Sequence, residues 1–340
     1  MHCPRSSAPR QQGAALIVAL LVFALCTALV VAMEMEFNRF YQRGANLLLA
    51  EQAHSYLRGA EALATLVLLA DYDEDRNREQ PRDDLKELWA QNAQPYPVEE
   101  GVMLQGRLQD LQGRFNLNTL ERRVVSSEGG PRFTAAQAQF IRLLQALGEP
   151  QVSELEAIAI TQAVSDWLDR DVEPAPEGAE DDYYYALTPA YRTANRPMAS
   201  VSELQAVANV TPQIYRALEP WVTVWPLVPA SLNIHTAPAV VLRSINTDDD
   251  LTPLTESDGE ALVAQRAEAG FADLEDFLAS PVFDGKGEKM EGMKALLGQE
   301  SSYFLLSAQV EVADRNMRLY SVLQREGRRV NALTRAAGSL

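Results

Sequence analysis

Cysteine and basic residues are scarce in this chain, and each shortage excludes a class of protein. Cys3 and Cys26 are the two cysteines among 340 residues, so no disulfide can form within the long region that follows them. Lysine and arginine total 30 against 47 acidic residues, which gives a net charge of −17. Because nucleic-acid-binding proteins present basic patches to phosphate, this balance argues against a nucleic-acid partner.

Recognisable catalytic motifs are also missing. The sequence has no G-x-S-x-G nucleophile elbow, and the Gly-Lys-Gly segment at 285–287 lacks the other residues of a phosphate-binding loop. His54 and His235 have no nearby histidine or cysteine with which to bind a metal. We therefore expect no enzyme. An anchored hydrolase that uses Asp166 and Asp169 as paired carboxylates is the weakest alternative.

The chain does contain a long apolar run near its N-terminus. Ala14–Met33 carries no charge over twenty residues, and a helix of that length rises about 30 Å, enough to cross the hydrocarbon core of a bilayer. Arg5 and Arg10 precede the run and Glu34 and Glu36 follow it, which predicts a cytoplasmic N-terminus and an exported remainder. A cleaved signal peptide is the alternative, but its apolar core usually spans only about 7–15 residues.

The apolar run continues without proline into an amphipathic segment. Apolar residues recur at helical spacing over residues 37–63. The sequence therefore predicts one long helix over Ala14–Ala70, half in the membrane and half outside it.

Strand and helix signals then alternate in a way that predicts one interrupted domain. Residues 98–120 show the period-two pattern of one hairpin or two short strands, and residues 302–334 the pattern of three strands. Between them helical spacing covers 133–147 and 154–168, with shorter helices expected at 201–207, 212–218, 238–245, 257–269, 273–279 and 290–297. We predict an α+β fold in which the long helix packs on an antiparallel sheet, with a large all-α insertion between the strand-rich parts.

The N-terminus resembles that of type IV pilin-like precursors. A short basic leader ends in Gly13 directly before the apolar helix, and in that family a prepilin peptidase cuts after the glycine, here between Gly13 and Ala14. Two positions depart from the common pilin pattern, because the first mature residue is Ala14 rather than phenylalanine and the fifth is Val18 rather than glutamate. That glutamate pairs with a neighbouring subunit's amine, so its absence fits a subunit with no neighbour ahead of it.

The missing glutamate and the large size together resemble the minor pseudopilin K (GspK) family of type II secretion systems. Further stretches resemble that family: LQGRLQDLQGRFNLNTL at 104–120, WLDRDVEPAPEGAEDDYY at 167–184, PAYRTANRPMASVSEL at 189–204 and SLNIHTAPAVVL at 231–242. The predicted organisation is a leader at 1–13, a transmembrane helix half at 14–33, a pilin-like α+β domain at 34–125 and 301–340, and a helical insertion domain at 126–300.

The resemblance implies a non-enzymatic subunit at the tip of a periplasmic pseudopilus, which helps drive folded proteins across the outer membrane. Its implied partners are the I- and J-type minor pseudopilins, the major pseudopilin, the prepilin peptidase, and secreted substrates or the outer-membrane channel. The expected location is the inner membrane, as a single-pass protein with its C-terminal domain in the periplasm. The alternative is a membrane-anchored calcium-binding interaction module that is not involved in secretion.

An acidic loop is the candidate metal site. Residues 166–182 hold eight carboxylates against one base, Arg170, and pooled like charges repel unless water or a cation neutralises them. Carboxylate oxygens without histidine or cysteine favour calcium over zinc or copper. A solvated loop without a metal is the alternative.

Spacing within this loop gives a partial ligand pattern. Asp169, Asp171 and Glu173 follow D-x-D-x-E, and Glu180 stands at the twelfth position of an EF-hand-like loop, but Pro174 replaces the turn glycine and excludes an EF-hand. The resemblance implies a structural Ca²⁺, since the helical domain of that family binds calcium. In order of preference the predicted ligands are Asp169, Asp171, Glu173, Glu180, Asp181 and Asp182.

Two other acidic groups are predicted to be solvated. Asp71, Asp73 and Asp75 follow D-x-D-x-D, but Arg76 stands where a turn glycine belongs, so we expect a loop after the long helix. The run Asp248–Asp250 likewise predicts a solvated turn.

Overall fold

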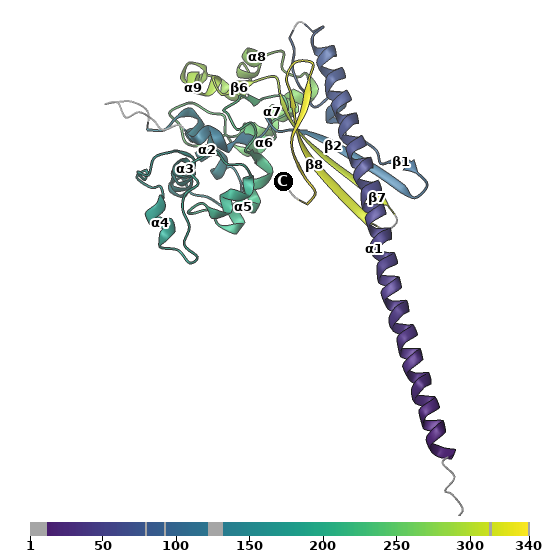
Figure 1. The fold of residues 1–340 in the computed structure, drawn as a ribbon. Coiled ribbons are helices and arrows are strands. Elements are labelled where there is room, and N and C mark those ends of the chain that lie inside the picture. The colour runs from purple at the N-terminus through teal and green to yellow at the C-terminus, as the bar shows by residue number, and fades with distance from the viewer. Residues whose placement is uncertain (1–11, 79, 92, 122–131, 313–314, 339–340) are drawn as a thin grey trace, which may run out of the picture.

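Two parts make up the molecule, a stem and a helical lobe. The computed structural model describes residues 12–121 and 132–338, apart from 79, 92, 313 and 314. The stem consists of the N-terminal helix and a five-stranded sheet, and the lobe consists of residues 115–121 and 132–298. The lobe lies to one side of the C-terminal half of the long helix, whose N-terminal half extends away alone (Figure 1).

The long helix α1 (Gln12–Asp75) is the axis of the stem. Its 64 residues span about 96 Å at 1.5 Å per residue. The apolar side chains of its first half are exposed, whereas Ala53, Leu57, Ala60, Ala64 and Leu68 form a buried stripe at the three- and four-residue spacing of one helix face. The predicted long helix is therefore confirmed, and it continues five residues beyond Ala70.

An antiparallel sheet covers the buried stripe of α1. Its strands lie in the order β1-β2-β7-β8-β9, and they comprise β1 (Tyr96–Glu99), β2 (Val102–Asp110), β7 (Tyr303–Val312), β8 (Arg315–Arg325) and β9 (Val330–Ala336). Alternate residues of β7 are buried, as expected for a strand with one face on a core. Strands β2 and β7 are paired neighbours, with Leu108 opposite Leu306, although the whole lobe separates them in sequence.

Short helices build most of the lobe. The α-helices are α2 (Ala135–Gln145), α3 (Glu154–Leu168), α4 (Asp181–Tyr185), α5 (Pro212–Leu218), α6 (Ala239–Leu242), α7 (Glu256–Glu268), α8 (Leu274–Leu278) and α9 (Glu291–Lys294). The 3₁₀ turns of the lobe are η2 (Leu117–Glu121), η3 (Val201–Ala206), η4 (Glu219–Trp221), η5 (Pro281–Phe283) and η6 (Gly287–Lys289), and η1 (Leu88–Ala90) packs on the stem. A capping box of Thr134 and Gln137 begins α2.

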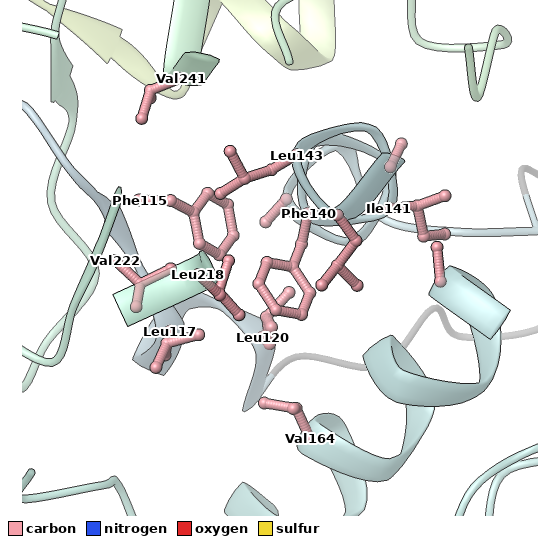
Figure 2. Close-up of a cluster of buried hydrophobic side chains, with 14 of the residues drawn as sticks. Phe115, Leu117, Leu120, Phe140, Ile141, Leu143, Val164, Leu218, Val222 and Val241 are labelled. Carbon is pink, nitrogen blue, oxygen red and sulfur yellow. The ribbon is translucent and has the colours of Figure 1, made fainter. Parts of the chain in front are cut away.

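The lobe has its own hydrophobic core, separate from that of the stem. Helix α2 lies at its centre, where Phe140 stacks on Phe115 with 5.1 Å between ring centroids. Figure 2 shows Val164 of α3, Leu218 of α5 and other apolar side chains around these rings. Because each part buries its own core, polar contacts between them decide how the lobe sits on the stem.

The lobe also contains two short parallel strand pairs that the sequence does not predict. Strand β3 (Phe115–Asn116) pairs with β4 (Val222–Thr223), and β5 (Leu232–Asn233) pairs with β6 (Leu297–Gly298). Strands of two residues are too short to give a periodic signal. Helix α4 is likewise a correction, because the acidic loop was predicted without a helix.

Candidate functional site

The acidic loop after α3 brings three of the predicted ligands together. Asp169 caps the C-terminal end of α3, and Glu180 directly precedes α4. One carboxylate oxygen from each of Asp169, Asp171 and Glu180 lies within 4.8 Å of the other two. Asp169 and Glu180 are buried, and Asp171 is exposed. The loop thus brings the carboxylates at its two ends close together.

Backbone hydrogen bonds hold the loop in this shape. The buried Asp166 carboxylate accepts from the backbone N–H of Ala175 at 3.1 and 3.2 Å, and the Gln162 side chain accepts from the N–H of Glu177 at 2.6 Å. Gly178 lies so close to Asp166 that an added Cβ would stand 1.9 Å from its Oδ2. The chain therefore turns back across the end of α3 and carries Glu180 to Asp169.

Glu180 is a buried carboxylate with one oxygen that accepts no hydrogen bond among the described residues. It is 4% exposed, Oε2 accepts from the Thr193 hydroxyl at 3.1 Å, and Oε1 has no hydrogen-bond donor among the described residues. Burial, with the nearby charges of Asp166 and Asp169, raises the pKa of Glu180 to about 7. A buried carboxylate oxygen without a donor beside two further carboxylates fits the oxygen-rich coordination of Ca²⁺.

The other three predicted ligands lie outside this group of oxygens. Glu173 is exposed. Asp181 begins α4, where its Oδ1 accepts from the backbone N–H and the hydroxyl of Thr193 at 3.1 and 3.0 Å. Asp182 lies in the first turn of the same helix and is exposed. Helix α4 thus directs Asp181 to Thr193 rather than to the oxygens of Asp169, Asp171 and Glu180.

A second acidic cluster corrects the predicted solvated loop after the long helix. Asp71 and Asp75 lie on the last turns of α1 and are 8% and 5% exposed. Their oxygens lie within 4.8 Å of those of Asp83 and Glu87, which are also buried. The solvated-loop prediction was wrong because α1 continues past Ala70. Asp73 faces outward and pairs with an arginine of the stem.

Two arginines form ion pairs with carboxylates of this second cluster. Arg325 on β8 donates to Asp71 at 2.6 Å and also to Asp83, and Arg78 lies 2.6 Å from Glu87. Sequence reasoning missed these partners because more than two hundred residues separate Asp71 from Arg325.

The turn at 248–250 also departs from prediction. The Asp248 carboxylate accepts from the backbone N–H groups of Gly292 and Met293 at 2.7 and 2.8 Å and so caps α9. Asp249 and Asp250 are exposed, as predicted. His235 is 2% exposed, and burial lowers the pKa of its imidazole.

The N-terminal half of α1 is the remaining functional element. Within the described residues this is the one helix long and apolar enough to cross a membrane, with a mean hydropathy of 3.0 over its best window. None of that window is buried against the protein. An apolar helix with no protein cover suits a lipid environment.

A membrane-capable helix that packs its distal half on an antiparallel sheet defines a pilin-like protein, here with a helical lobe inserted between β2 and β7. The chain belongs to the type II secretion system protein K family. Residues 113–227 and 232–296 match the family described as "Type II secretion system (T2SS), protein K".

Relatives match the chain over nearly its whole length. Type II secretion system protein K of Pectobacterium carotovorum subsp. carotovorum is 33% identical over 97% of both chains, and that of Pseudomonas aeruginosa is 34% identical over 93% of this chain and 89% of its own. A chain in the crystal structure of the GspK-GspI-GspJ complex from the enterotoxigenic Escherichia coli type 2 secretion system matches with a TM-score of 0.74 and 26% identity. That match covers 88% of this chain and all of the other.

Proposed function

We propose that this protein is a minor pseudopilin at the tip of a type II secretion pseudopilus, where it assembles with I- and J-type minor pseudopilins. The observation that carries the proposal is the match, over 88% of this chain, to a chain solved as part of a GspK-GspI-GspJ complex. The proposed role is structural, which agrees with a family of secretion-system components.

The shape of the molecule supports a position at the filament end. In a filament, pilin-like stems stack along α1, so a large lobe beside one end of the stem obstructs the next subunit above it (Figure 1). At the tip no subunit must occupy that space. Val18, which replaces the usual glutamate, supports the same position because nothing ahead of the tip subunit needs to be paired.

The proposed location is the inner membrane, with the helix over Ala14–Met33 as a single span and the stem and lobe in the periplasm. Arg5 and Arg10 support a cytoplasmic leader. The prepilin peptidase is then the processing enzyme, and the major pseudopilin the subunit that follows. The lobe, as the outermost part, is the surface proposed to meet secreted substrates or the outer-membrane channel.

We further propose that the acidic loop binds a structural Ca²⁺. Asp169, Asp171 and Glu180 would hold the ion, with backbone carbonyls and water completing its shell. Calcium supplies the positive charge that a loop with pooled carboxylates and no disulfide needs. Glu173 and Asp182 are proposed as outer ligands that reach the ion through water, and Asp181 as a residue that orders the loop.

The experiment that tests the function removes the gene from its native host and measures export. We expect folded exoproteins to accumulate in the periplasm and the full chain to restore their release. Co-expression with the host's I- and J-type pseudopilins should yield a complex that co-purifies from membranes. Normal export together with no co-purification would contradict the proposal and favour an anchored calcium-binding module not involved in secretion.

A further inference from the structure

The stem and the lobe meet at a buried charge network, formed by the carboxylates of Asp71, Asp75, Asp83 and Glu87 with two arginines. One oxygen from each carboxylate lies within 4.8 Å of the others, and none of the four residues is more than 8% exposed. Four carboxylates so close together and so well buried must be neutralised, because an uncompensated buried charge is very costly.

The two arginines neutralise only half of this charge. Arg325 is shared between Asp71 and Asp83, and Arg78 lies 2.6 Å from Glu87 and 2.9 Å from Asp75. Each guanidinium thus serves two carboxylates, so two negative charges are left over. The surrounding charged groups do not remove this excess. Lys86 is the one cation among them without an ion-pair partner in the described residues, and the acidic Glu74 on α1 and Asp110 on β2 outweigh it. Arg82 and Asp84 neutralise each other.

Protons account for the missing positive charge. Burial raises the pKa of Asp71 and of Glu87, and a neighbouring carboxylate adds to the effect, Asp83 for Asp71 and Asp71 for Glu87. Burial raises the pKa of both Asp75 and Asp83 to about 7, and in Asp75 the charges of Glu87 and Asp71 add to the effect. A cavity of about 500 Å³ beside Asp71, Arg78 and Glu87 gives water access to the network.

Asp83 connects the network to the lobe. Its backbone N–H donates to the carbonyl of Gln299 at 3.0 Å, and its own carbonyl accepts from the Asn233 side chain at 3.0 Å. Its carboxylate accepts from the N–H of Ser301 at 2.6 Å. These groups facing Asp83 are uncharged, so the lobe supplies it no compensating cation here. The same residue therefore binds Arg325 in the stem, the Asn233 side chain of the lobe, and the segment at 299–301 through which the chain passes from the lobe to β7.

We propose that this network is a proton-loaded joint, in which protons shared among Asp71, Asp75, Asp83 and Glu87 hold the lobe on the stem and their loss at alkaline pH loosens it. The inference concerns how the lobe is held and goes beyond the role in secretion. The direction follows from linkage, because a carboxyl group whose pKa is higher in the folded protein than in the unfolded chain weakens folding as pH rises through the folded value. The joint is then firm in mildly acidic conditions and loose above neutrality.

The test is hydrogen exchange of the full chain in detergent micelles between pH 6 and 8.5, with EDTA present. Protection factors are corrected for the intrinsic pH dependence of exchange. We expect protection of the Asp83 and Ser301 amides to fall about tenfold or more over this range, since one pKa unit corresponds to a tenfold change. Amides within the β7–β8 pair should keep their protection. Constant protection at Asp83 and Ser301 would overturn the proposal.

Variants assign the effect to the network. Asp75→Asn removes one excess charge without changing shape and should at least halve the pH-dependent fall in protection. Asp73→Asn is the matched control, because Asp73 lies two residues away on the same helix but points outward to Arg328 at 3.1 Å. Arg78→Gln removes a compensating cation, which raises the pKa of Asp75 and of Glu87, and should move the fall about one pH unit higher. Equal effects of Asp75→Asn and Asp73→Asn would contradict the proposal.

A metal ion is the competing source of positive charge, and the same measurement separates the two. Restored protection at pH 8.5 on addition of Ca²⁺ would show that a cation rather than protons neutralises the network. No restoration by Ca²⁺, with recovery on return to pH 6, supports the proton-loaded joint. If Asp75→Asn does not fold, the wild-type profile and Arg78→Gln still decide the question.

Discussion

At the scale of the residue, the proposed calcium site depends on a few carboxylates. We predict that wild-type protein melts about 5–10 °C higher in excess Ca²⁺ than in chelator, because a ligand present at a hundred times its Kd adds about 2.7 kcal/mol to the free energy of unfolding. Asp171→Ala should remove this difference in calorimetry while melting as wild type does in chelator. Glu177→Ala, in the same loop but outside the cluster, should keep it. Equal melting of wild type in both media would refute the calcium site.

Gly178 carries a second prediction at this scale. Gly178→Ala should lower the free energy of unfolding by about 1–3 kcal/mol, because its Cβ would stand 1.9 Å from the Asp166 carboxylate. The strain must displace the hydrogen bond from Ala175 or move the loop. Gly287→Ala is the control, since a Cβ there meets nothing within 4 Å. Equal urea midpoints for the two variants would show that the close approach of Gly178 to Asp166 does not affect the free energy of unfolding.

The sequence predicted only part of the positions of the individual acidic side chains. The pool of carboxylates at 166–182 was visible, and the spacing of Asp169, Asp171 and Glu180 pointed to residues that the fold does bring together. The sequence could not separate Asp181 from them, because the short helix α4 and the position of Thr193 decide where that side chain points. Nothing local indicated that Asp71 would be buried, since its partner Arg325 lies on a distant strand.

At the scale of the element, Glu61 joins α1 to the last two strands. Its carboxylate accepts from Arg335 of β9 at 2.7 and 2.9 Å and from the hydroxyl of Ser321 on β8 at 2.7 Å. Burial alone would raise the pKa of Glu61, but the hydrogen bonds from Arg335 and Ser321 outweigh it and hold the value below 4.5. This contact therefore stabilises the folded stem above pH 4.5, and its contribution is lost as pH falls below that value.

Glu61→Gln tests this contact. At pH 7 we predict a loss of about 1–2 kcal/mol in the free energy of unfolding, a modest figure because Arg335 is 41% exposed and its charge is screened by water. In urea denaturation near pH 3 the difference between wild type and variant should shrink towards zero, because the wild-type carboxylate becomes protonated. Glu51→Gln, on an exposed part of α1, should be neutral at both pH values. A loss that did not depend on pH would indicate a packing effect instead.

Long elements were predicted well and short ones poorly, for a physical reason. Helix α3 (Glu154–Leu168) and the strands of the sheet follow from periodicity, because each spans several turns or alternations. The two-residue strands β3 and β6 form where distant segments meet, and no pattern in two residues predicts that meeting. Helix α1 was predicted too short at its C-terminal end, since its last acidic turn is stabilised by ion pairs with Arg78 and Arg325 and not by apolar spacing.

At the scale of the whole molecule, the sequence predicted that a helical lobe interrupts the sheet, but not how that lobe packs on the stem. Strand signals on both sides of a helical stretch imply that the two strand-rich parts share a sheet, and the pairing of β2 with β7 is the result. How the lobe sits on the stem depends instead on contacts such as Arg82 Nη1 to the Phe271 carbonyl at 2.8 Å. Such contacts join residues that are remote in sequence, so they have no local signature.

In the proposed assembly, processing of the N-terminus would allow the stem to leave the membrane and enter a filament. We predict that Gly13→Ala blocks cleavage, because the peptidase of pilin-like precursors cuts after this glycine, and that the intact mass of the membrane-extracted chain then includes residues 1–13. Gly44→Ala is the control, since this exposed glycine on α1 has nothing within 4 Å of an added Cβ. It should leave a chain that begins at Ala14. A Gly13→Ala chain that still begins at Ala14 would refute the cleavage site. Another enzyme would then remove the leader, and the apolar helix would be an ordinary membrane anchor.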